Sequence, residues 1–448
     1  MYDEYTVTPV PWIERMPAHW ELIRGKNLYE KMQRPVQDSD EVITCFRDGT
    51  VTLRKNRRTT GFTESLKEVG YQGIRMGDLV IHVMDAFAGS IGVSDSNGKG
   101  TPVYSVCQSK RDCNSYYYAF LLREMARTGY IQSLYRGIRE RSSDFRFEVF
   151  AAQFYPVPPR EEQDQIVRFL DWKVSAINRL ISAKKKEIAL LNEIKRTRIE
   201  SALSYGIHDE TVITTGNPWL PVAPKSWRKM RHKNVLTEKK EFVGDKASEY
   251  TLLSLTTNGV IVRDIESGKG KFPSDFSTYQ IVEHGDMVFC LFDVDETPRT
   301  VGLSEHSGMI TGAYSVFVPH DAIPEYLYFY FLAIDNKKGF RPLYSGLRKV
   351  VGKDIFMRQS IYLPSAEEQA ELVKYLKLIE EKTQTVINSY NREIENLYEF
   401  RNKLISDVVT GQIDVRDIEV PDFEYVREDA DGESEENDES SEGEQDEE

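Results

Sequence analysis

The residues best suited to chemistry in this sequence are clustered arginine and lysine side chains. In the first half of the chain, Arg54, Lys55 and Arg57 stand within four consecutive positions, and Arg139 and Arg141 belong to a second cluster. Lysine and arginine neutralise phosphates, and the planar arginine fork can also bind the edge of a guanine base. These clusters therefore favour contact with a nucleic acid.

The second half of the chain holds basic residues in matching places. Arg348, Lys349 and Lys353 lie in the stretch that matches the second cluster, and Lys269 and Lys271 add to this set. A single basic residue is usually a solvated surface charge, but clusters that recur at equivalent positions point to a shared role. We therefore predict two DNA-binding surfaces, one in each half, with lysine contacting phosphates and arginine discriminating bases.

Catalytic signatures are missing from the sequence. There is no phosphate-binding glycine loop, no dinucleotide fingerprint, no nucleophile elbow and no zinc-protease motif. The four cysteines and seven histidines show no zinc-ligand spacing. We therefore expect a non-catalytic chain without a catalytic residue, a metal or a cofactor of its own.

Two segments of the sequence suggest enzymatic alternatives. The segment 217–219 faintly resembles the Asn-Pro-Pro-aromatic motif of amino-methyltransferases, but its second proline is missing and it matches positions 11–12, where no asparagine precedes the proline. Asp293, Asp295 and Glu296 could contribute to the metal site of a nuclease, but the first half has a single carboxylate at the matching place. Neither reading explains the rest of the sequence.

The chain is an internal duplication with an offset near 207 residues. Collinear matches include Pro11-Trp12 with Pro218-Trp219, Gly77-Asp78 with Gly285-Asp286, Gly137-Ile138-Arg139 with Gly346-Leu347-Arg348, and Glu161-Glu162-Gln163 with Glu367-Glu368-Gln369. A slowly drifting offset is what a duplication with small insertions leaves behind. Each half then begins with an α+β domain, in which 79–84, 251–255 and 314–318 are expected strands and 116–130 and 326–340 expected helices.

Each α+β domain is followed by a long helix. The segments 160–205 and 365–410 contain no proline or glycine, and each lies between a proline and a glycine. Apolar residues recur at spacings of three, four or seven along the first helix and of three, four, seven or eight along the second, a pattern typical of a coiled-coil seam. The predicted seam residues are Leu170, Val174, Ile177, Ile181, Ile188 and Leu191 in the first helix, and Leu376, Ile379, Val386, Ile394, Leu397 and Leu404 in the second, followed by Val408.

A narrow apolar stripe on a lone helix would stay half exposed, so we expect the two helices to pack on each other. The antiparallel orientation is favoured, because it places the two domains in pseudo-twofold symmetry. The alternative is that each helix packs on its own domain.

Composition sets the remaining limits. The formal net charge is −14, but 13 acidic residues fall within 428–448, so the rest of the chain is nearly neutral. This acidic segment is expected to be a disordered, solubilising tail. The four cysteines are expected to be reduced thiols of a cytoplasmic protein. The N-terminus lacks a signal-peptide pattern, and the longest apolar run, 326–334, is too short to span a bilayer.

At this point the residues resemble a known family, the specificity subunits of Type I restriction–modification systems. The resemblance covers about 1–415 and rests on the alternation of domain and long helix. It rests also on Gly137-Ile138-Arg139 leading to Pro158-Pro159 and Gln163, and on Gly346-Leu347-Arg348 leading to Pro364 and Gln369. The first copy departs from the family pattern in the residues before its prolines, and the acidic tail is not part of it.

The resemblance implies an organisation and a set of partners. It implies target-recognition domains at 1–158 and 208–364, spacer helices at 159–207 and 365–415, and a tail at 416–448. Double-stranded DNA, two methyltransferase subunits carrying S-adenosylmethionine, and translocating nuclease subunits using ATP and Mg²⁺ would be the partners. The implied function is recognition of an asymmetric bipartite DNA target. The rival hypothesis is a duplicated protein–protein scaffold that does not read DNA.

Overall fold

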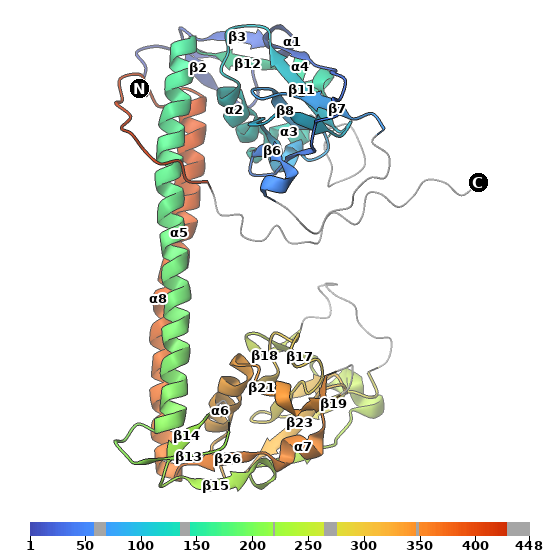
Figure 1. The fold of residues 1–448 in the computed structure, drawn as a ribbon, viewed down its shortest axis with the longest axis vertical. Coiled ribbons are helices and arrows are strands. Elements are labelled where there is room, and N and C mark those ends of the chain that lie inside the picture. The colour runs from blue at the N-terminus through green and yellow to red at the C-terminus, as the bar shows by residue number, and fades with distance from the viewer. Residues whose placement is uncertain (58–68, 135–143, 218–219, 264–275, 346–348, 428–448) are drawn as a thin grey trace, which may run out of the picture. The chain divides into compact units, whose positions relative to one another are not determined.

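The computed structural model describes residues 1–57, 69–134, 144–217, 220–263, 276–345 and 349–427. The chain divides into two compact units (Figure 1). Unit 1 is Met1–Lys185 with Arg392–Glu448, and unit 2 is Lys186–Asn391. Each unit contains one α+β lobe and parts of two long helices. We call residues 1–158 lobe 1 and residues 208–364 lobe 2.

Lobe 1 is built on a four-stranded antiparallel sheet with the order β4-β11-β8-β9. Its strands are β4 (Tyr29–Lys31), β8 (Leu79–His82), β9 (Ile91–Val93) and β11 (Tyr104–Ser109). Four two-stranded pairs accompany it: β1 (Tyr5–Val7) with β2 (Arg15–Pro17), β3 (Glu21–Arg24) with β12 (Phe154–Val157), β5 (Ile43–Cys45) with β6 (Val51–Leu53), and β7 (Gln72–Ile74) with β10 (Gly98–Gly100). The helices are α1 (Gly25–Leu28), η1 (Arg54–Asn56), η2 (Ala86–Ala88), α2 (Ser115–Arg127), α3 (Tyr130–Ser133) and α4 (Phe147–Ala152).

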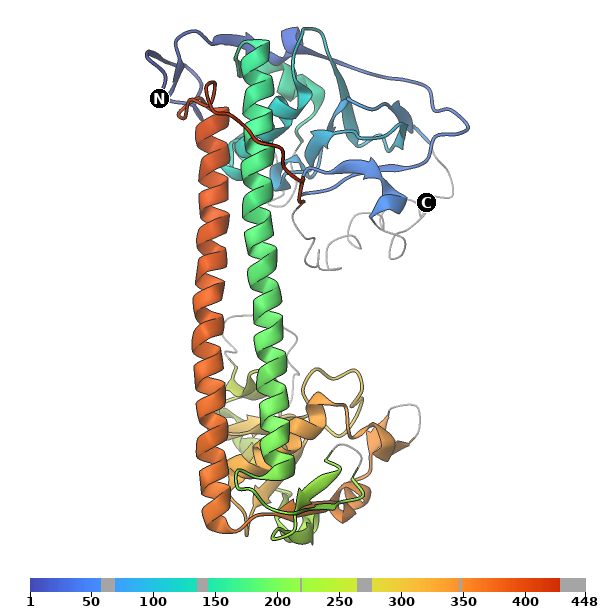
Figure 2. The same cartoon turned by 60° about the vertical axis from the view of Figure 1, so that its left-hand side comes forward.

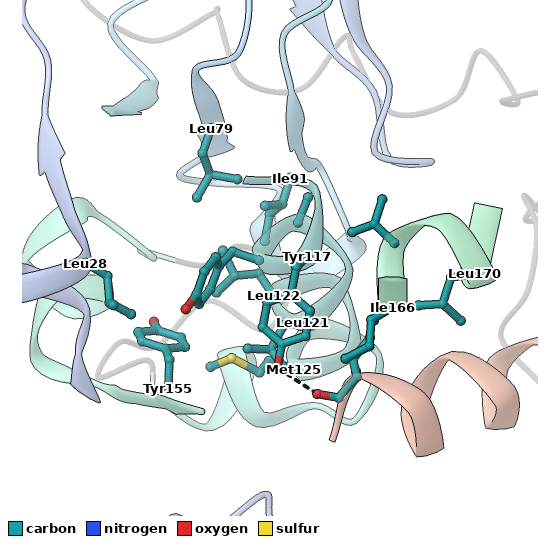
Figure 3. Packing of buried hydrophobic residues seen from close by; sticks show 14 of the residues in the cluster. Leu28, Leu79, Ile91, Tyr117, Leu121, Leu122, Met125, Tyr155, Ile166 and Leu170 are labelled. Atoms are coloured by element: carbon teal, nitrogen blue, oxygen red, sulfur yellow. Dashed lines mark hydrogen bonds between the residues drawn. The ribbon is translucent and has the colours of Figure 1, made fainter. Parts of the chain in front are cut away.

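The core of unit 1 joins lobe 1 to the long helices. Figure 3 shows Leu121 and Leu122 of α2 near Ile166 of the long helix α5 (Arg160–Tyr205), and all three are fully buried. Tyr117 of α2 donates a hydrogen bond from its hydroxyl to the carbonyl oxygen of Val409, at 3.0 Å. Because one core cluster contains residues of the lobe and of both long helices, the lobe and the helix ends form one packed body.

Lobe 2 repeats the topology of lobe 1. Its four-stranded sheet has the order β16-β23-β20-β21, with β16 (Leu236–Lys239), β20 (Met287–Phe289), β21 (Val301–Leu303) and β23 (Ser315–Pro319). The two-stranded pairs are β13 (Val212–Thr214) with β14 (Val222–Pro224), β15 (Arg228–Arg231) with β26 (Ser360–Leu363), β17 (Leu253–Thr256) with β18 (Gly259–Val262), β19 (Gln280–Val282) with β22 (Gly308–Ile310), and β24 (Tyr344–Ser345) with β25 (Val350–Val351). Its helices are η3 (His232–Asn234), η4 (Gly244–Glu249), α6 (Pro324–Asn336), η5 (Arg341–Leu343) and α7 (Lys353–Arg358).

The long helices are α5 (Arg160–Tyr205) and α8 (Ala366–Val409), and they pack together. Figures 1 and 2 show them side by side. In unit 1 the beginning of α5 meets the end of α8, where Arg401 donates to the Oδ1 of Asn178 at 2.8 Å and Lys184 pairs with Glu393. In unit 2 the end of α5 shares a core cluster with the beginning of α8. The predicted antiparallel packing of the two helices is therefore confirmed.

The alternative, in which each helix packs only on its own lobe, is wrong. The N-terminal part of α5 does pack on lobe 1, through Ile166 and Leu170, but Val408 and Val409 of α8 lie in the same cluster. Lobe 2 is packed in the same way, on the beginning of α8 and the end of α5. Each lobe therefore holds the start of one long helix and the end of the other.

Most predicted seam residues are buried or partly buried. Those less than a tenth exposed are Leu170, Ile177, Ile181, Leu376, Ile379, Ile394 and Val408. Val174, Ile188, Leu191, Leu397 and Leu404 are of intermediate exposure.

Val386 corrects the predicted seam. Its side chain is 39% exposed, whereas its neighbour Ile387 is 6% exposed. Three helical turns take about 11 residues at 3.6 residues per turn, so Ile387 lies on the face of Leu376 and Val386 is turned away from it by most of a right angle. A strict seven-residue step from Ile379 predicts Val386 as the seam residue, whereas the buried residue of this pair is Ile387.

The structure also corrects the expected start of the tail. Residues 416–427 pack on α5, and Val420 is only 6% exposed. The strongly acidic stretch 428–448 lies outside the described residues. The four cysteines are free thiols. In the parts of the chain that the structure describes, no helix combines the length and apolar character needed to span a bilayer.

Candidate nucleic-acid interface

Three of the basic residues predicted for lobe 1, Arg54, Lys55 and Arg57, lie at the end of the β5–β6 hairpin. Strand β6 runs directly into η1, which contains Arg54 and Lys55. The Nε of Arg54 donates to the Oγ1 of Thr44 at 3.2 Å, and Lys55 pairs with Glu41. The hairpin thus holds Arg54 through Thr44 of its first strand, β5. Lys55 is held through Glu41, which lies just before β5 in the chain.

Arg57 completes this basic turn and is the most firmly held of the three. Its guanidinium lies over the ring of Phe46, 4.4 Å from the centroid, and its Nη1 is 2.6 Å from the Oδ2 of Asp48. Burial raises the pKa of Asp48, but the hydrogen bond from Thr50 and the charge of Arg57 outweigh it, so that the pKa lies below its ordinary value. Asp48 therefore stays ionised at neutral pH and holds Arg57 against the hairpin.

In lobe 2, Lys349 stands at the start of β25 and is bound to an acidic turn. Its Nζ lies 2.8 Å from the Oε1 of Glu296 and 3.6 Å from the Oδ2 of Asp295. The hydrogen bond to Glu296 raises the pKa of Lys349, so the lysine remains charged. Lys349 has φ of 47°, and Asp293 on the facing turn has φ of 46°, a left-handed conformation that is costly for residues other than glycine.

Lys353, the first residue of α7, is held from the central sheet. It pairs with Glu238 of β16, which also pairs with Lys240 at 3.2 Å. Burial raises the pKa of Glu238, but the two lysines lower it by more. The pKa of Glu238 therefore lies below its ordinary value. Lys353 and Lys349 are four residues apart, but they are anchored by different elements.

The structure therefore places five of the ten predicted DNA contacts. Arg54, Lys55 and Arg57 are brought together on one turn, and Lys349 and Lys353 flank β25. The other five lie outside the described residues: Arg139, Arg141, Lys269, Lys271 and Arg348.

The geometry adds two basic residues that the sequence reasoning missed. Arg47 lies in the turn between β5 and β6, is 47% exposed and pairs with Asp85 at 3.3 Å. Arg263 follows β18 as Arg54 follows β6. The backbone N–H of Arg54 donates to the oxygen of Val42 at 2.8 Å, and that of Arg263 donates to the oxygen of Leu252 at 2.8 Å. An alignment of the two repeats through these hairpins could have found Arg263.

These contacts define what the surface can do chemically. Lys55, Arg57, Lys349 and Lys353 each already carry a carboxylate partner. The pairs of Lys55, Lys349 and Lys353 lie nearer the surface, where ion pairs are weak, so a phosphate can replace their carboxylates at low cost. The pairs hold the cations in place before a polyanion arrives.

The carboxylates that the sequence suggests as a nuclease site are bound to side chains of lobe 2. Asp295 accepts a hydrogen bond from the hydroxyl of Tyr344 at 3.0 Å and lies 3.7 Å from Arg341, and Glu296 binds Lys349. Within the described ranges, no group of three or more His, Cys, Asp or Glu side chains could hold a metal ion. Those carboxylates position basic side chains of lobe 2.

Both lobes are joined to their helices by the same contacts. The Nε1 of Trp20 donates to Glu162 at 3.0 Å, as that of Trp227 donates to Glu368 at 3.0 Å. The side-chain amide of Gln163 donates to the oxygen of Pro158 at 2.8 Å, and its oxygen accepts from the N–H of Asn114 at 2.9 Å. Gln369 repeats both bonds with Pro364, at 3.0 Å, and Ile323, at 2.8 Å. The repeated Glu-Gln motif thus attaches each basic surface to the start of a long helix.

Comparison with known proteins gives the same fold. No protein-family model matches the chain. One chain of a solved structure described as "Structural basis underlying complex assembly and conformational transition of the type I R-M system" is similar with a TM-score of 0.63 and 12% identity, over 89% of this chain and 99% of that one. The HsdS subunit from Thermoanaerobacter tengcongensis matches at 14% identity over 89% and 98%, with a TM-score of 0.46. The Type I restriction-modification S subunit from M. genitalium matches at 14% over 90% and 98%, with a TM-score of 0.33.

Proposed function

We propose that this chain is the specificity subunit of a Type I restriction–modification system and that it reads DNA without catalysing a reaction. The observation that carries the proposal is the duplication of one arrangement. Two lobes of the same topology each present basic residues on loops, and each lobe is attached to the antiparallel helix pair by the same Trp-Glu and Gln-Pro bonds.

Bipartite recognition follows from this arrangement. Each lobe reads one short half-site, and the helix pair sets the distance between half-sites, as dimeric readers demand sites about 34 Å apart. The two lobes differ in their loop sequences, with Arg54-Lys55-Asn56-Arg57 after β6 and a single Arg263 in the described residues after β18. The two half-sites therefore differ, and the target is asymmetric.

The chemistry belongs to partner subunits. Two methyltransferase subunits bind S-adenosylmethionine and modify an adenine, which they extrude from the base stack. Nuclease subunits that use ATP and Mg²⁺ join them for restriction. The similarity to a chain of a type I R-M structure supports this partner set.

The test replaces Arg348 and Lys349 together by alanine in the complex with the methyltransferase subunit. We expect DNA affinity to fall about tenfold at moderate salt, and the salt slope to fall because fewer phosphates are neutralised. The matched control replaces Lys225 and Lys246, which are exposed and lie in the same lobe, by alanine. Equal affinities for the two double variants would count against the assignment.

A second experiment exchanges residues 215–364 for the equivalent lobe of a related chain. Methylated adenines are then mapped by single-molecule sequencing of host DNA. The proposal expects one half-site to change while the other stays the same. A change in both half-sites would exclude independent reading by the lobes.

A protein–protein scaffold remains the second candidate, because one observation favours it. Four of the five described basic candidates are paired with carboxylates, so these four side chains are balanced by negative charges of the chain itself. A titration with duplex DNA at several salt concentrations separates the candidates. Counterion release predicts a steep salt slope for a DNA reader and none for a scaffold.

A further inference from the structure

The chain that follows α8 crosses α5 within unit 1. We call residues 412–427 the C-terminal segment, and Figure 2 shows it in dark red, crossing the green helix α5. The side-chain amide of Gln165 donates to the carbonyl oxygen of Val415 at 2.9 Å, and Arg168 donates to that of Val420 at 3.1 Å. Val415 and Val420 are buried in the core cluster that lobe 1 shares with the long helices. The C-terminal segment therefore follows a fixed path through unit 1.

The last residues of the C-terminal segment reach lobe 1. Asn178 donates to the carbonyl oxygen of Val426 at 3.0 Å, and the backbone N–H of Val426 donates to the hydroxyl of Ser175 at 3.1 Å. The guanidinium of the next residue, Arg427, lies 3.8 Å from the carboxylate of Asp95. Arg427 is the last residue that the structure describes. The described chain therefore ends at a contact with lobe 1.

Asp95 lies beside the strand that leads into the basic residues of lobe 1. Its backbone N–H donates to the carbonyl oxygen of Val51 at 3.1 Å, and Ser94 forms a β-bridge with Val51. Val51 is the first residue of β6, and Arg54 follows three residues later, about 10 Å along an extended strand. We call three residues after β6 the basic turn: Arg54, Lys55 and Arg57. The described chain thus ends close to the basic turn.

Tyr425 supports this placement. Burial raises the pKa of Tyr425, the charge of Asp171 raises it further, and the charge of Asp48 adds to the increase. Asp48 is the carboxylate that pairs with Arg57 at 2.6 Å. Because the charges that shift a pKa are those of nearby groups, Asp48 and its partner Arg57 lie near the end of the C-terminal segment.

The sequence beyond Arg427 is strongly acidic. We call residues 428–448 the acidic tail; it lies outside the described residues and contains 13 Asp or Glu and no Lys or Arg. Fully extended, 21 residues span at most about 70 Å, so the acidic tail is long enough to reach every residue of the basic turn. In that form it would carry one carboxylate about every 5–6 Å, whereas one strand of DNA carries a phosphate about every 3.4 Å. The acidic tail is thus a polyanion of lower charge density than DNA.

We infer that the acidic tail binds the basic turn of lobe 1 and competes there with DNA. This inference rests on the proposed function, because it concerns the regulation of the same basic residues. A covalently attached segment competes at an effective concentration in about the mM range, so a weak contact is enough to occupy the turn when DNA is absent. DNA displaces the tail because its phosphates are more closely spaced. The main effect is on non-target DNA, since its binding depends on phosphate contacts.

The first experiment compares the full chain with a chain that ends at Arg427, each assembled with the methyltransferase subunit. The probe is a duplex of non-target sequence at low salt. The shortened chain is expected to bind this duplex about tenfold more tightly, because its basic turn has lost an attached competitor, and high salt should reduce the gain. Circular dichroism and thermal melting establish that both chains are folded.

Two further backgrounds locate the gain within lobe 1. When the basic turn carries Arg54→Ala, Lys55→Ala and Arg57→Ala, removal of the acidic tail is expected to give no gain, because the two sites are coupled. The matched control removes three exposed charges near β4, at the edge of the sheet opposite to β9. Its substitutions are Lys26→Ala, Lys31→Ala and Lys110→Ala. In this control background the full gain should persist.

The alternative is an acidic tail that only keeps the chain soluble. A gain that disappears in the basic-turn background and persists in the control background supports the inference. An affinity that does not change when the tail is removed overturns the inference and leaves the proposed function intact. An equal gain in both backgrounds also overturns it, because the tail then acts through net charge alone.

Cross-linking separates this inference from the proposed function, because it needs no DNA. A carbodiimide joins a lysine amine to a carboxylate that touches it, and mass spectrometry of the digested full chain identifies the pairs. Links from the acidic tail to Lys55 should clearly outnumber links to the three control lysines, and added duplex DNA should suppress them. Links spread evenly over all four lysines overturn the inference. If neither complex binds duplex DNA, the proposed function fails, and the cross-links alone decide whether the tail binds the basic turn.

Discussion

The indole Nε1 of Trp20 donates a hydrogen bond to the Oε1 of Glu162 at 3.0 Å. Glu162 is the third residue of α5 and is only 5% exposed, and it also binds His19 at 2.8 Å and the hydroxyl of Tyr2. The equivalent Glu368 binds Trp227 at 3.0 Å and is more exposed. One buried carboxylate thus ties the N-terminal residues of lobe 1 to the start of its long helix.

Glu162→Ala is therefore predicted to destabilise unit 1 strongly. The change leaves the buried Tyr2 hydroxyl and Trp20 indole without their acceptor and removes the partner of the more exposed His19, which costs about 3 kcal/mol of unfolding free energy. Glu368→Ala removes a bond to one indole and is expected to cost about 1 kcal/mol. Urea denaturation monitored by tryptophan fluorescence measures both values. Glu161→Ala, at an exposed neighbouring position, serves as the control, and a Glu162→Ala variant no less stable than this control would contradict the prediction.

Two glycines end the long helices, and alanine at each is predicted to have unequal effects. Gly206 and Gly411 both have φ of 73°, which costs a residue with a Cβ about 1 kcal/mol. A Cβ on Gly411 would lie 2.4 Å from the Cδ of Pro17 and 2.8 Å from Trp20, whereas one on Gly206 would meet Glu368 at 3.2 Å. Gly411→Ala should lower the melting temperature by more than Gly206→Ala does. Equal losses would show that only the backbone conformation matters.

The ends of the long helices were predictable because local signals agree there. The sequence predicts helices over 160–205 and 365–410, and the structure has Arg160–Tyr205 and Ala366–Val409. The lack of internal glycine and proline and the flanking residues set these limits without tertiary information. The expected helices 116–130 and 326–340 likewise match α2 and α6 except in their last turns.

What the sequence did not reveal depends on contacts between distant segments. The pairing of Lys349 with Glu296 joins residues 53 positions apart on two loops, and no local pattern encodes it. The segment 416–427 lacks helical or strand periodicity, and its acidic residues led to its assignment as tail, yet Val420 packs against residues some 250 positions earlier. The composition of a segment indicates how well water solvates it. Whether the segment is buried depends on the surface that it packs against.

Asp171 predicts a pH-dependent stability of unit 1. Burial raises the pKa of Asp171 from 3.8 to about 6. Its carboxyl lies near Tyr425, in the segment that follows α8, and near Tyr116 of α2. The folded state therefore favours the protonated carboxyl. The penalty for ionising it is absent below pH 3.8, grows as pH rises, and is complete above about pH 6.

Asp171→Asn should therefore stabilise unit 1 at pH 7.5 by about 2 kcal/mol and should have little effect near pH 4. Urea denaturation at the two pH values provides the measurement. The control is Asp417→Asn, an exposed change in the segment that follows α8. This variant should be as stable as the unaltered chain at both pH values. A gain that is the same at pH 4 and pH 7.5 would mean that ionisation of Asp171 is not its cause.

A substitution of Glu296 tests whether Lys349 of lobe 2 contacts a phosphate of the DNA. Its carboxylate holds Lys349 at 2.8 Å, and under the proposed function a phosphate oxygen replaces this carboxylate in the DNA complex. Glu296→Gln keeps the size of the side chain but removes the competing charge. If Lys349 exchanges its carboxylate for a phosphate, DNA affinity of the assembled complex should rise about three- to tenfold at low salt, a gain that screening reduces at high salt.

Glu305→Gln controls for the general change in net charge, because Glu305 is exposed in the same lobe and forms no ion pair with a lysine among the described residues. The gain for Glu296→Gln should clearly exceed that for Glu305→Gln, and it should vanish when Lys349→Ala is added. A double-mutant cycle that shows additive effects of Glu296 and Lys349 would place Lys349 away from the phosphates. A loss of affinity in Glu296→Gln would instead show that the carboxylate is needed to hold Lys349 and its hairpin in the DNA-binding arrangement.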